Sequence, residues 1–289
     1  MVPEMMLESR KNMNSQFRKA AVIGSPIKHS KSPLIQNYAI KEAGIDGEYS
    51  AIELKNLEAI TNFISDLKSL DWAGVNVTIP HKEAIIPYLD EQSENVQMIG
   101  ACNTIVNKNG TLIGYNTDAE GFYFPIKDKG ICSALILGNG GASKAVLYQC
   151  AKMGVKQLML VARDHQKSAA LCSRLETVFN VDIQKKRFNE MSKVGALPFD
   201  LIVNTTSVGM NESDAPFDFI QTIGQGQIFY DLIYSPWETK MMKMSKENGA
   251  ETINGAMMLA HQGALAFELF FNQKADTFGM YQQLLESFK

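Results

Sequence analysis

The stretch LILGNGGASKA, residues 135–145, joins a short apolar run to a cluster of glycines and then to a helix-forming segment. Such a run is typical of a buried parallel strand. Glycines let backbone N–H groups approach a ligand, and the first turn of a helix adds unpaired N–H groups and the positive end of the dipole. The stretch is a shortened dinucleotide-binding fingerprint and predicts a phosphate or pyrophosphate site. The alternative is a helix packed closely on a strand, with the glycines serving only the packing.

A second apolar run, residues 157–161, is followed by Arg163 and Asp164. In a nucleotide-binding unit, the end of the second strand faces the adenosine ribose. A carboxylate there favours the free 2′-hydroxyl of NAD, and a guanidinium favours the 2′-phosphate of NADP. Because both side chains are present, this pattern leaves the choice between the two cofactors open.

The chain has 289 residues, a formal net charge of −3 and 45% hydrophobic residues. This length suggests one or two domains with buried cores. No basic run favours nucleic acid, and no apolar run is long enough to cross a membrane. Scattered cysteines suggest reduced thiols in a cytoplasmic protein, and the histidines lack the spacing of metal ligands, so we expect no metal. The polar residues 1–19 do not resemble a secretory signal and suggest a flexible extension.

Strand and helix patterns alternate after residue 20, which indicates a parallel sheet in the first half of the chain too. Ser32 precedes Pro33, so we expect Ser32 to cap a helix that has Pro33 at its first position. Ser30 has no such task, and two hydroxyls at a helix N-terminus suit a ligand carboxylate. The spacing supports the cap and the ligand contact about equally. Asn109-Gly110 between two apolar runs predicts a hairpin.

Lys82 follows Pro80, where the pattern predicts the start of a helix. A cation at a helix N-terminus opposes the dipole, so its placement there needs a reason. One interpretation is a solvated surface lysine, and the other is a lysine that exchanges a proton with a substrate. Asp118 follows the predicted hairpin at the start of another helix, and its spacing alone favours a simple N-cap.

The second half of the chain places polar residues directly after the predicted strands 200–204 and 227–233. At the carboxyl ends of parallel strands such side chains face the ligand crevice of a doubly wound sheet. A long apolar helix is expected over residues 256–271, with Gln262 inside it. A buried Gln needs hydrogen-bond partners, which the backbone or water at a helix edge also supplies.

Seven motifs in this order identify a family. They are Ser30-Lys31-Ser32-Pro33 with Asn37, NVTIPHK at residues 76–82, ACNT at 101–104, GYNTD at 114–118, the glycine turn, NTTSVGM at 204–210, and MLAHQ at 258–262. From about residue 20 to residue 285 the chain resembles the shikimate dehydrogenase family, including its quinate/shikimate branch. The resemblance implies an α/β fold of two domains with a cleft between them: a parallel-sheet substrate domain and a Rossmann-like, doubly wound nucleotide domain.

The implied boundaries are 1–118 for the substrate-binding catalytic domain, 119–254 for the NADP-binding domain, and 255–289 for C-terminal helices that return to the substrate domain. The implied reaction is hydride transfer between nicotinamide and C3 of shikimate, which interconverts shikimate and 3-dehydroshikimate in chorismate biosynthesis. The partner would be this small-molecule substrate, with neither nucleic acid nor membrane, and the protein would be a monomer or homodimer.

The resemblance also implies roles for single residues. Lys82 and Asp118 are the catalytic pair. The expected substrate contacts are Ser30, Ser32, Thr78, Asn103, Tyr234 and Gln262. The expected cofactor contacts are Gly138, Asn139, Gly140, Gly141, Ala142, Arg163, Asp164, Met210 and Gly255.

The chain departs from the family pattern at three places. Gln36-Asn37 stands where the family often has His-Asn, and Met257 stands where many relatives have Gly. Asp164 follows Arg163 where the family usually has Thr. Arg163 supports NADP, Asp164 would repel a 2′-phosphate, and Lys167 would compensate, so NADP is favoured modestly.

Three other functions fit parts of the pattern. The first is a quinate dehydrogenase that uses NAD. The second is a nucleotide-binding sensor without catalysis, against which the intact Lys82 and Asp118 argue. The third is another two-domain dehydrogenase of a small carbonyl or imine substrate, which would not need Ser30, Ser32 or Gln262.

Overall fold

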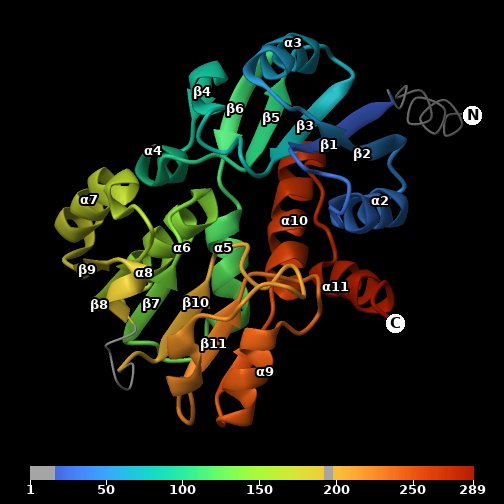
Figure 1. Ribbon diagram of the computed structural model, residues 1–289. Coiled ribbons are helices and arrows are strands. Elements are labelled where there is room, and N and C mark those ends of the chain that lie inside the picture. The colour runs from blue at the N-terminus through green and yellow to red at the C-terminus, as the bar shows by residue number, and fades with distance from the viewer. Residues whose placement is uncertain (1–16, 192–197) are drawn as a thin grey trace, which may run out of the picture.

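The computed structural model describes residues 17–191 and 198–289, which form two six-stranded sheets (Figure 1). The first sheet has the strand order β2-β1-β3-β5-β6-β4. Its strands are β1 (Arg18–Gly24), β2 (Gly47–Glu53), β3 (Trp72–Val77), β4 (Glu91–Gln92), β5 (Thr104–Lys108) and β6 (Thr111–Tyr115). The first three strands are parallel, as predicted, and the β5–β6 hairpin joins β3 antiparallel, which makes the sheet mixed.

The hairpin turn is formed by Asn109 and Gly110, as their sequence predicts. Both residues have positive φ angles, 54° and 90°. Asn and Gly tolerate this conformation, which matches the twist of the two strands. The turn therefore sets the register that brings Thr104 opposite Tyr115 and delivers the following residues to the site.

The first sheet is covered by helices from both ends of the chain. They are α2 (Ser32–Glu42), α3 (Leu57–Leu67), α4 (Glu94–Ile99), α10 (Ala256–Phe271) and α11 (Thr277–Glu286). Figure 1 shows α10 and α11, drawn in red, beside α2 at this sheet. One buried cluster joins side chains of α2, β1, α10 and α11. The C-terminal helices therefore pack against the first half of the chain.

The second sheet has the order β12-β11-β10-β7-β8-β9, and all its pairs are parallel. Its strands are β7 (Ser133–Leu137), β8 (Gln157–Val161), β9 (Asp182–Lys186), β10 (Leu201–Asn204), β11 (Ile228–Asp231) and β12 (Glu251–Ile253). Counted from β7, the order is 3-2-1-4-5-6, that of a doubly wound dinucleotide-binding sheet. The strand order reverses between β7 and β10, where such sheets bind ligands.

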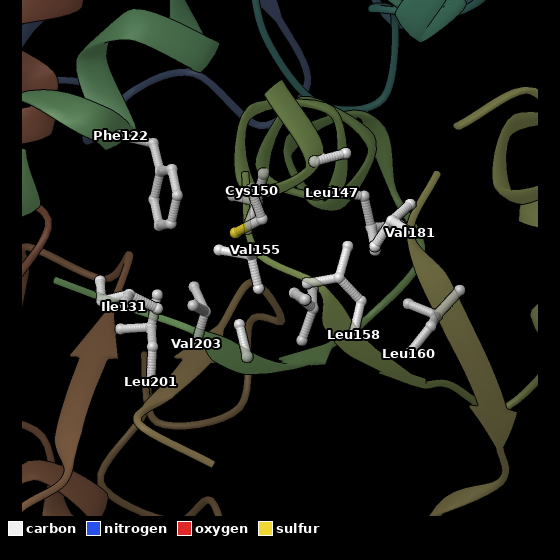
Figure 2. Close-up of a cluster of buried hydrophobic side chains, with 14 of the residues drawn as sticks. Phe122, Ile131, Leu147, Cys150, Val155, Leu158, Leu160, Val181, Leu201 and Val203 are labelled. Carbon is white, nitrogen blue, oxygen red and sulfur yellow. The ribbon is translucent and has the colours of Figure 1, made fainter. Parts of the chain in front are cut away.

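Helices cover both faces of this second sheet. They are α5 (Asp118–Tyr123), α6 (Gly141–Lys152), α7 (Ala169–Phe179), α8 (Phe188–Met191) and α9 (Lys240–Glu247). Ile136 of β7 belongs to the same buried cluster as Phe122 of α5 and Leu147 of α6, both of which Figure 2 labels, while its neighbour Leu135 packs with side chains of α8 and α9. Burying an aliphatic side chain in this way contributes about 1.5–3 kcal/mol. The apolar run of β7 is thus explained by burial on both faces.

Three local expectations are wrong. Strand β1 begins at Arg18, so Arg18 and Lys19 are not part of an extension, while residues 1–16 lie outside the described part of the chain. The N-cap of α2 is Lys31 rather than Ser32, and the Ser30 hydroxyl accepts the Ser32 N–H at 3.3 Å. No α-helix begins after Pro80: residues 80–85 form turns, followed by the 3₁₀ helix η1 (Ile86–Tyr88), so the dipole argument for Lys82 does not apply.

Candidate active site

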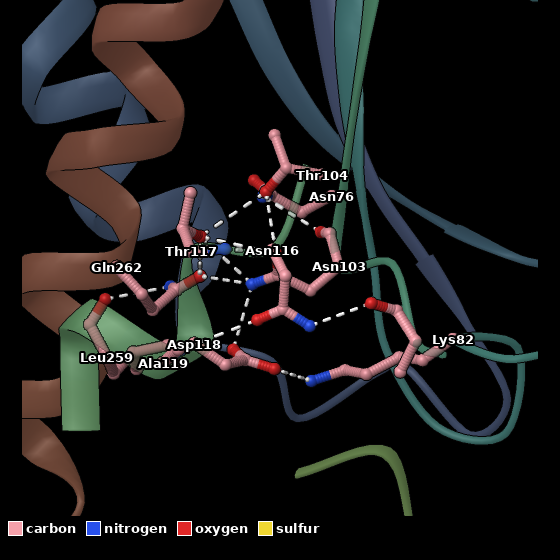
Figure 3. A network of polar contacts seen from close by, with 11 residues as sticks. Asn76, Lys82, Asn103, Thr104, Asn116, Thr117, Asp118, Ala119, Leu259 and Gln262 are labelled. Carbon is pink, nitrogen blue, oxygen red and sulfur yellow. Dashed lines mark hydrogen bonds and ion pairs between the residues drawn. The ribbon is translucent and has the colours of Figure 1, made fainter. Parts of the chain in front are cut away.

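Lys82 and Asp118 meet in an ion pair. Lys82 Nζ lies 2.5 Å from Asp118 Oδ2, and the two side chains are 14% and 7% exposed. Lys82 belongs to the turns after β3, and Asp118 is the first residue of α5 (Figure 3). Thr117 is the N-cap of α5, so the prediction of Asp118 as a simple N-cap is wrong. An ammonium group with so little solvent exposure can deliver a proton to a ligand that binds beside it.

Asn103 fixes the other oxygen of Asp118. Its Oδ1 accepts the backbone N–H of Thr117 at 2.7 Å, and because an N–H group only donates, this bond sets the orientation of the amide. Asn103 Nδ2 therefore donates to Asp118 Oδ1 at 2.8 Å and to Thr117 Oγ1 at 2.9 Å. Both carboxylate oxygens of Asp118 are thus held by side chains from the first sheet and its connections.

A further buried layer supports Asn103 from β2 and β3. Asn76 Nδ2 donates to the Asn103 carbonyl at 3.2 Å and to Thr104 Oγ1 at 3.0 Å. The Tyr49 hydroxyl donates to Asn76 Oδ1 at 2.7 Å, and burial raises the pKa of Tyr49 well above its usual value, so this group stays a donor. Sequence reasoning assigned no role to Tyr49 or Asn76, although Asn76 stands in one of the quoted motifs.

Gln262 reaches the same network from α10. Its Nε2 donates to the Leu259 carbonyl at 2.9 Å, and its Oε1 accepts from Asn103 Nδ2 at 3.3 Å and from Thr117 Oγ1 at 3.4 Å. The backbone bond expected of a helix-edge Gln is present, but the oxygen is turned into the site (Figure 3). The returning C-terminal helix therefore contributes directly to the polar cluster.

The other expected substrate contacts lie in the loop between β1 and α2, which carries Ser30 and leads to Ser32 at the start of α2, and after strands β3 and β11. The Thr78 N–H donates to the Ile23 carbonyl at 2.9 Å, which ties the end of β3 to the end of β1, just before that loop. Tyr234 contacts that loop: burial raises its pKa, and a hydrogen bond with the backbone of Lys31 opposes the rise. Within residues 17–191 and 198–289, no direct hydrogen bond joins the hydroxyls of Ser30, Ser32, Thr78 or Tyr234 to Lys82 or Asp118.

The glycine turn lies at the point where the strand order of the second sheet reverses. Gly138 has φ +111°, and a Cβ there would lie 2.6 Å from Thr205 Oγ1, so packing alone explains this glycine. A Cβ on Gly140, the N-cap of α6, would meet nothing within 4 Å. Packing does not explain Gly140, which favours the interpretation of the turn as a ligand site. Asn139 and Ala142 lie in the same turn and the first turn of α6, and their N–H groups fit a pyrophosphate.

Arg163 and Asp164 lie exposed after β8. Asp164 Oδ1 accepts the Gln166 N–H at 3.1 Å and caps the 3₁₀ helix η3 (His165–Ser168), while the Asp164 carbonyl accepts from Asn139. One oxygen of the Asp164 carboxylate is therefore engaged by the backbone. Among the described residues, no hydrogen bond or ion pair engages the guanidinium of Arg163. This arrangement fits a 2′-phosphate better than the sequence alone suggests.

Met210 and Gly255 lie in segments that follow strands β10 and β12 of the second sheet. Met210 is 54% exposed in the turn after β10, and Gly255 is the N-cap of α10. A Cβ on Gly255 would lie 2.0 Å from the Leu232 carbonyl oxygen, so close packing requires a glycine here whether or not a cofactor binds.

Within the described ranges, no group of three or more His, Cys, Asp or Glu side chains is arranged to hold a metal ion. Among the same residues, none of the helices has both the length and the apolar character needed to cross a membrane.

Comparison with known proteins gives a consistent result. The family model for the shikimate dehydrogenase substrate binding domain matches residues 22–105, and that for the shikimate 5′-dehydrogenase C-terminal domain matches residues 255–285. The chain is 36% identical over 278 residues to the shikimate dehydrogenase (NADP(+)) of Caldanaerobacter subterraneus subsp. tengcongensis, an alignment that covers 94% of this chain and 98% of the relative.

Two solved structures are similar over nearly the whole chain. Shikimate 5-dehydrogenase from Thermus thermophilus, in complex with NADP(H) and shikimate, is 33% identical with a TM-score of 0.81, covering 93% of this chain and 99% of that one. Quinate dehydrogenase from Corynebacterium glutamicum, in complex with NAD, is 26% identical with a TM-score of 0.84, covering 93% and 99%.

Proposed function

The chain belongs to the shikimate dehydrogenase family, and from this premise we propose that it catalyses the reversible, NADP-dependent reduction of 3-dehydroshikimate to shikimate. The observation that carries the proposal is the Lys82–Asp118 ion pair. Its Nζ and Oδ2 atoms lie 2.5 Å apart, and both side chains are largely buried. It combines a proton donor with an orienting carboxylate at the edge of a dinucleotide-binding turn.

The chemistry requires a proton to move with the hydride. Nicotinamide bound at the proposed cofactor site would supply the acceptor for the hydride that leaves C3 of shikimate. The C3 hydroxyl must lose its proton as the carbonyl forms, and we assign Lys82 Nζ, the partner of Asp118, as the group that takes it. In the reductive direction the Lys82 ammonium returns this proton to the oxygen. Asp118 would hold the ammonium in position for both directions, and Asn103 fixes the carboxylate of Asp118.

The hydroxyl-bearing loops and Gln262 complete the proposed substrate site. Ser30 and Ser32 suit the substrate carboxylate, because two hydroxyls close to a helix N-terminus can donate to an anion. Thr78, Asn103, Tyr234 and Gln262 are the proposed contacts to the rest of the substrate. The hydrogen bond that joins Asn103 to Gln262 supports their assignment to one site.

The proposed cofactor site runs along the carboxyl edge of the second sheet. The turn from Gly138 to Ala142 would hold the pyrophosphate and Arg163 the 2′-phosphate. Met210 and Gly255 would lie towards the nicotinamide. The Asp164 carboxylate serves as a backbone cap, which gives it a role other than a ribose contact and leaves Arg163 as the proposed contact to the 2′-phosphate.

We propose the domain division 1–118, 119–254 and 255–289. The strands of the first sheet fall within the first range and those of the second sheet within the second, which supports these boundaries. We also propose a cytoplasmic location and a monomeric or homodimeric protein.

The second candidate is quinate oxidation with NAD, which the likeness to an NAD-bound quinate dehydrogenase favours. Four oxidation assays separate the candidates: shikimate or quinate, each with NADP⁺ or NAD⁺, followed by the absorbance of reduced nicotinamide. Activity confined to shikimate with NADP⁺ supports the proposal. A preference for quinate or NAD⁺ assigns the chain to the other branch, and inactivity in all four assays rejects both.

A further inference from the structure

A second ion pair crosses between the two halves of the molecule next to Lys82. Lys144 Nζ lies 2.6 Å from Glu83 Oε2. Lys144 is in the first turn of α6, immediately after the glycine turn, and Glu83 follows Lys82 in the chain. The pair therefore joins the proposed pyrophosphate site directly to the segment that carries the proposed proton donor.

The two partners differ in burial. The Lys144 side chain is only 10% exposed, whereas that of Glu83 is 49% exposed. A lysine is rarely buried without a partner, and the first turn of a helix is an unfavourable place for a cation. The Glu83 carboxylate is the charge that compensates both effects. The α6 N-terminus thus depends on a side chain from the other half of the chain.

The Lys82 side chain itself packs on this turn of α6. A Cβ placed on Gly141 would lie 3.0 Å from Lys82 Cβ and 3.1 Å from Lys82 Cδ. Ala101 lies beside Gly141 as well, and it packs in a small buried cluster with Ile99, Ala119 and Ala145. On the opposite side, the Lys82 carbonyl accepts the Cys102 N–H at 2.8 Å.

We propose that Glu83 and Lys144 are positioning residues, which hold the Lys82 segment against α6 so that the Lys82 ammonium stays on Asp118, beside the proposed pyrophosphate turn. The inference rests on the proposed function, because it gives Lys82 a catalytic role. Neither Glu83 nor Lys144 touches the reacting atoms in this arrangement. They act on catalysis by fixing the position of the Lys82 side chain.

The same helix offers a matched control. Lys152, in the last turn of α6, pairs with Glu120 of α5 at 2.9 Å, and both side chains are nearly half exposed. This pair also joins α6 to a neighbouring helix, but it does not touch the Lys82 segment. Surface pairs of this kind contribute little. Glu120→Gln and Lys152→Met therefore test the loss of an α6 ion pair without loss of the proposed positioning.

The experiment compares Glu83→Gln, Lys144→Met and the double variant with wild type and with the control variants. We expect Glu83→Gln to lower kcat for shikimate oxidation about tenfold, since a small misplacement of a catalytic group is costly, with little change in either KM. The double variant should lose about as much as Glu83→Gln alone, because the two residues act as one unit. The control variants should stay within about twofold of wild type.

A second readout does not depend on turnover. Limited acetylation with acetic anhydride, followed by peptide mass spectrometry, reports the reactivity of Lys82 relative to Lys55, whose side chain is 75% exposed. Lys82 should react severalfold faster in Glu83→Gln than in wild type and at the wild-type rate in the controls. An inactive wild type would reject the proposed function, while the acetylation ratio would still test the positioning.

Three results would overturn the inference. The first is a Glu83→Gln enzyme with wild-type kcat and wild-type Lys82 reactivity. The second is a purely additive double variant, which would mean that Lys144 serves the cofactor phosphates independently of Glu83. The third is an equal loss in the Glu120→Gln and Lys152→Met controls, which would assign the effect to the general packing of α6.

Discussion

Asn103 Nδ2 donates to Asp118 Oδ1 at 2.8 Å, on the carboxylate whose other oxygen holds Lys82. The amide cannot turn away, because the N–H of Thr117 occupies its oxygen. An ammonium has three donors, and Asp118 engages one of them. Asn103 thus fixes the carboxylate, the carboxylate fixes the ammonium, and the ammonium keeps donors for the substrate oxygen.

Lys82→Met should abolish most of the activity while preserving the fold. Methionine retains an unbranched apolar stem against Gly141 but cannot transfer a proton. Loss of such a group typically lowers kcat about 10²- to 10⁴-fold. Steady-state oxidation of shikimate measures the loss, and titration of NADP⁺ by fluorescence serves as the control for an intact cofactor site. A variant that keeps most of its kcat would remove Lys82 from the mechanism.

Asn103→Ala should release Asp118 and lower kcat/KM about 10- to 100-fold, the value of a hydrogen bond to a charged group. Asn107 of β5, the strand that begins directly after Asn103, is a matched control: its buried amide donates to the carbonyls of Leu67 and Ser69, away from the site. Asn107→Ala should destabilise the protein comparably, as judged by urea unfolding, and leave kcat/KM unchanged. Equal kinetic losses in the two variants would show that Asn103 acts only through stability.

The sequence predicts those parts of the fold that local rules govern. The apolar run of β7 with its glycine turn and the Asn109-Gly110 hairpin are examples, since burial and permitted φ angles decide each within a few residues. The helix expected after Pro80 fails because the chain there is held by distant contacts, such as that of buried His81 Nε2 with the Leu54 carbonyl at 2.6 Å.

Only those site residues that a residue type or a family motif indicates could be predicted from the sequence. Lys82 and Asp118 could be named from these, and the structure brings them together. The partnership of Tyr49 with Asn76, and that of Glu83 with Lys144, were not predicted. The members of these pairs are 27 and 61 residues apart, and no periodicity connects them. Long-range polar pairing of this kind becomes visible only when the sheets and helices are assembled.

Gly255→Ala should destabilise the protein by about 1–3 kcal/mol, because overpacking against backbone leaves little room for relaxation. The added Cβ would lie 2.0 Å from the Leu232 carbonyl oxygen. Gly140→Ala is the contrast, since its Cβ meets nothing within 4 Å. It should unfold at the wild-type urea concentration yet bind NADP⁺ more weakly. Wild-type stability of Gly255→Ala would contradict the packing argument.

Asp231 should make the protein less stable as pH rises from 4 to 6. Burial raises the pKa of Asp231 to about 6, and hydrogen bonds from Thr239, Ile233 and Asn204 oppose the rise only in part. Because the pKa of the native carboxyl is above its usual 3.8, the native state binds more protons than the unfolded state in this range. The contribution of Asp231 to the free energy of unfolding therefore falls as pH rises through it.

Asp231→Asn removes this titration and preserves an acceptor for Asn204 and Ile233. The difference in free energy of unfolding, variant minus wild type, should increase by on the order of 3 kcal/mol between pH 4 and pH 7. Urea unfolding of both proteins at several pH values measures it, and all other titrating groups cancel in the difference. A difference that stays constant with pH would mean that Asp231 is ionised throughout.

Arg163→Ala should change the cofactor preference. If the guanidinium binds the 2′-phosphate, the KM for NADP⁺ rises about 10- to 100-fold, the value of a charge-assisted hydrogen bond, while the KM for NAD⁺ is unchanged. Asp164→Asn is the matched control, because Asn also caps η3 and only the charge is lost. Since the Asp164 carboxylate accepts the Gln166 N–H at 3.1 Å, this variant should keep its KM for NADP⁺ within about twofold. An equal effect of Arg163→Ala on both cofactors would place the guanidinium away from the ribose, and a large gain in NADP⁺ affinity in Asp164→Asn would show that the carboxylate faces the 2′-phosphate after all.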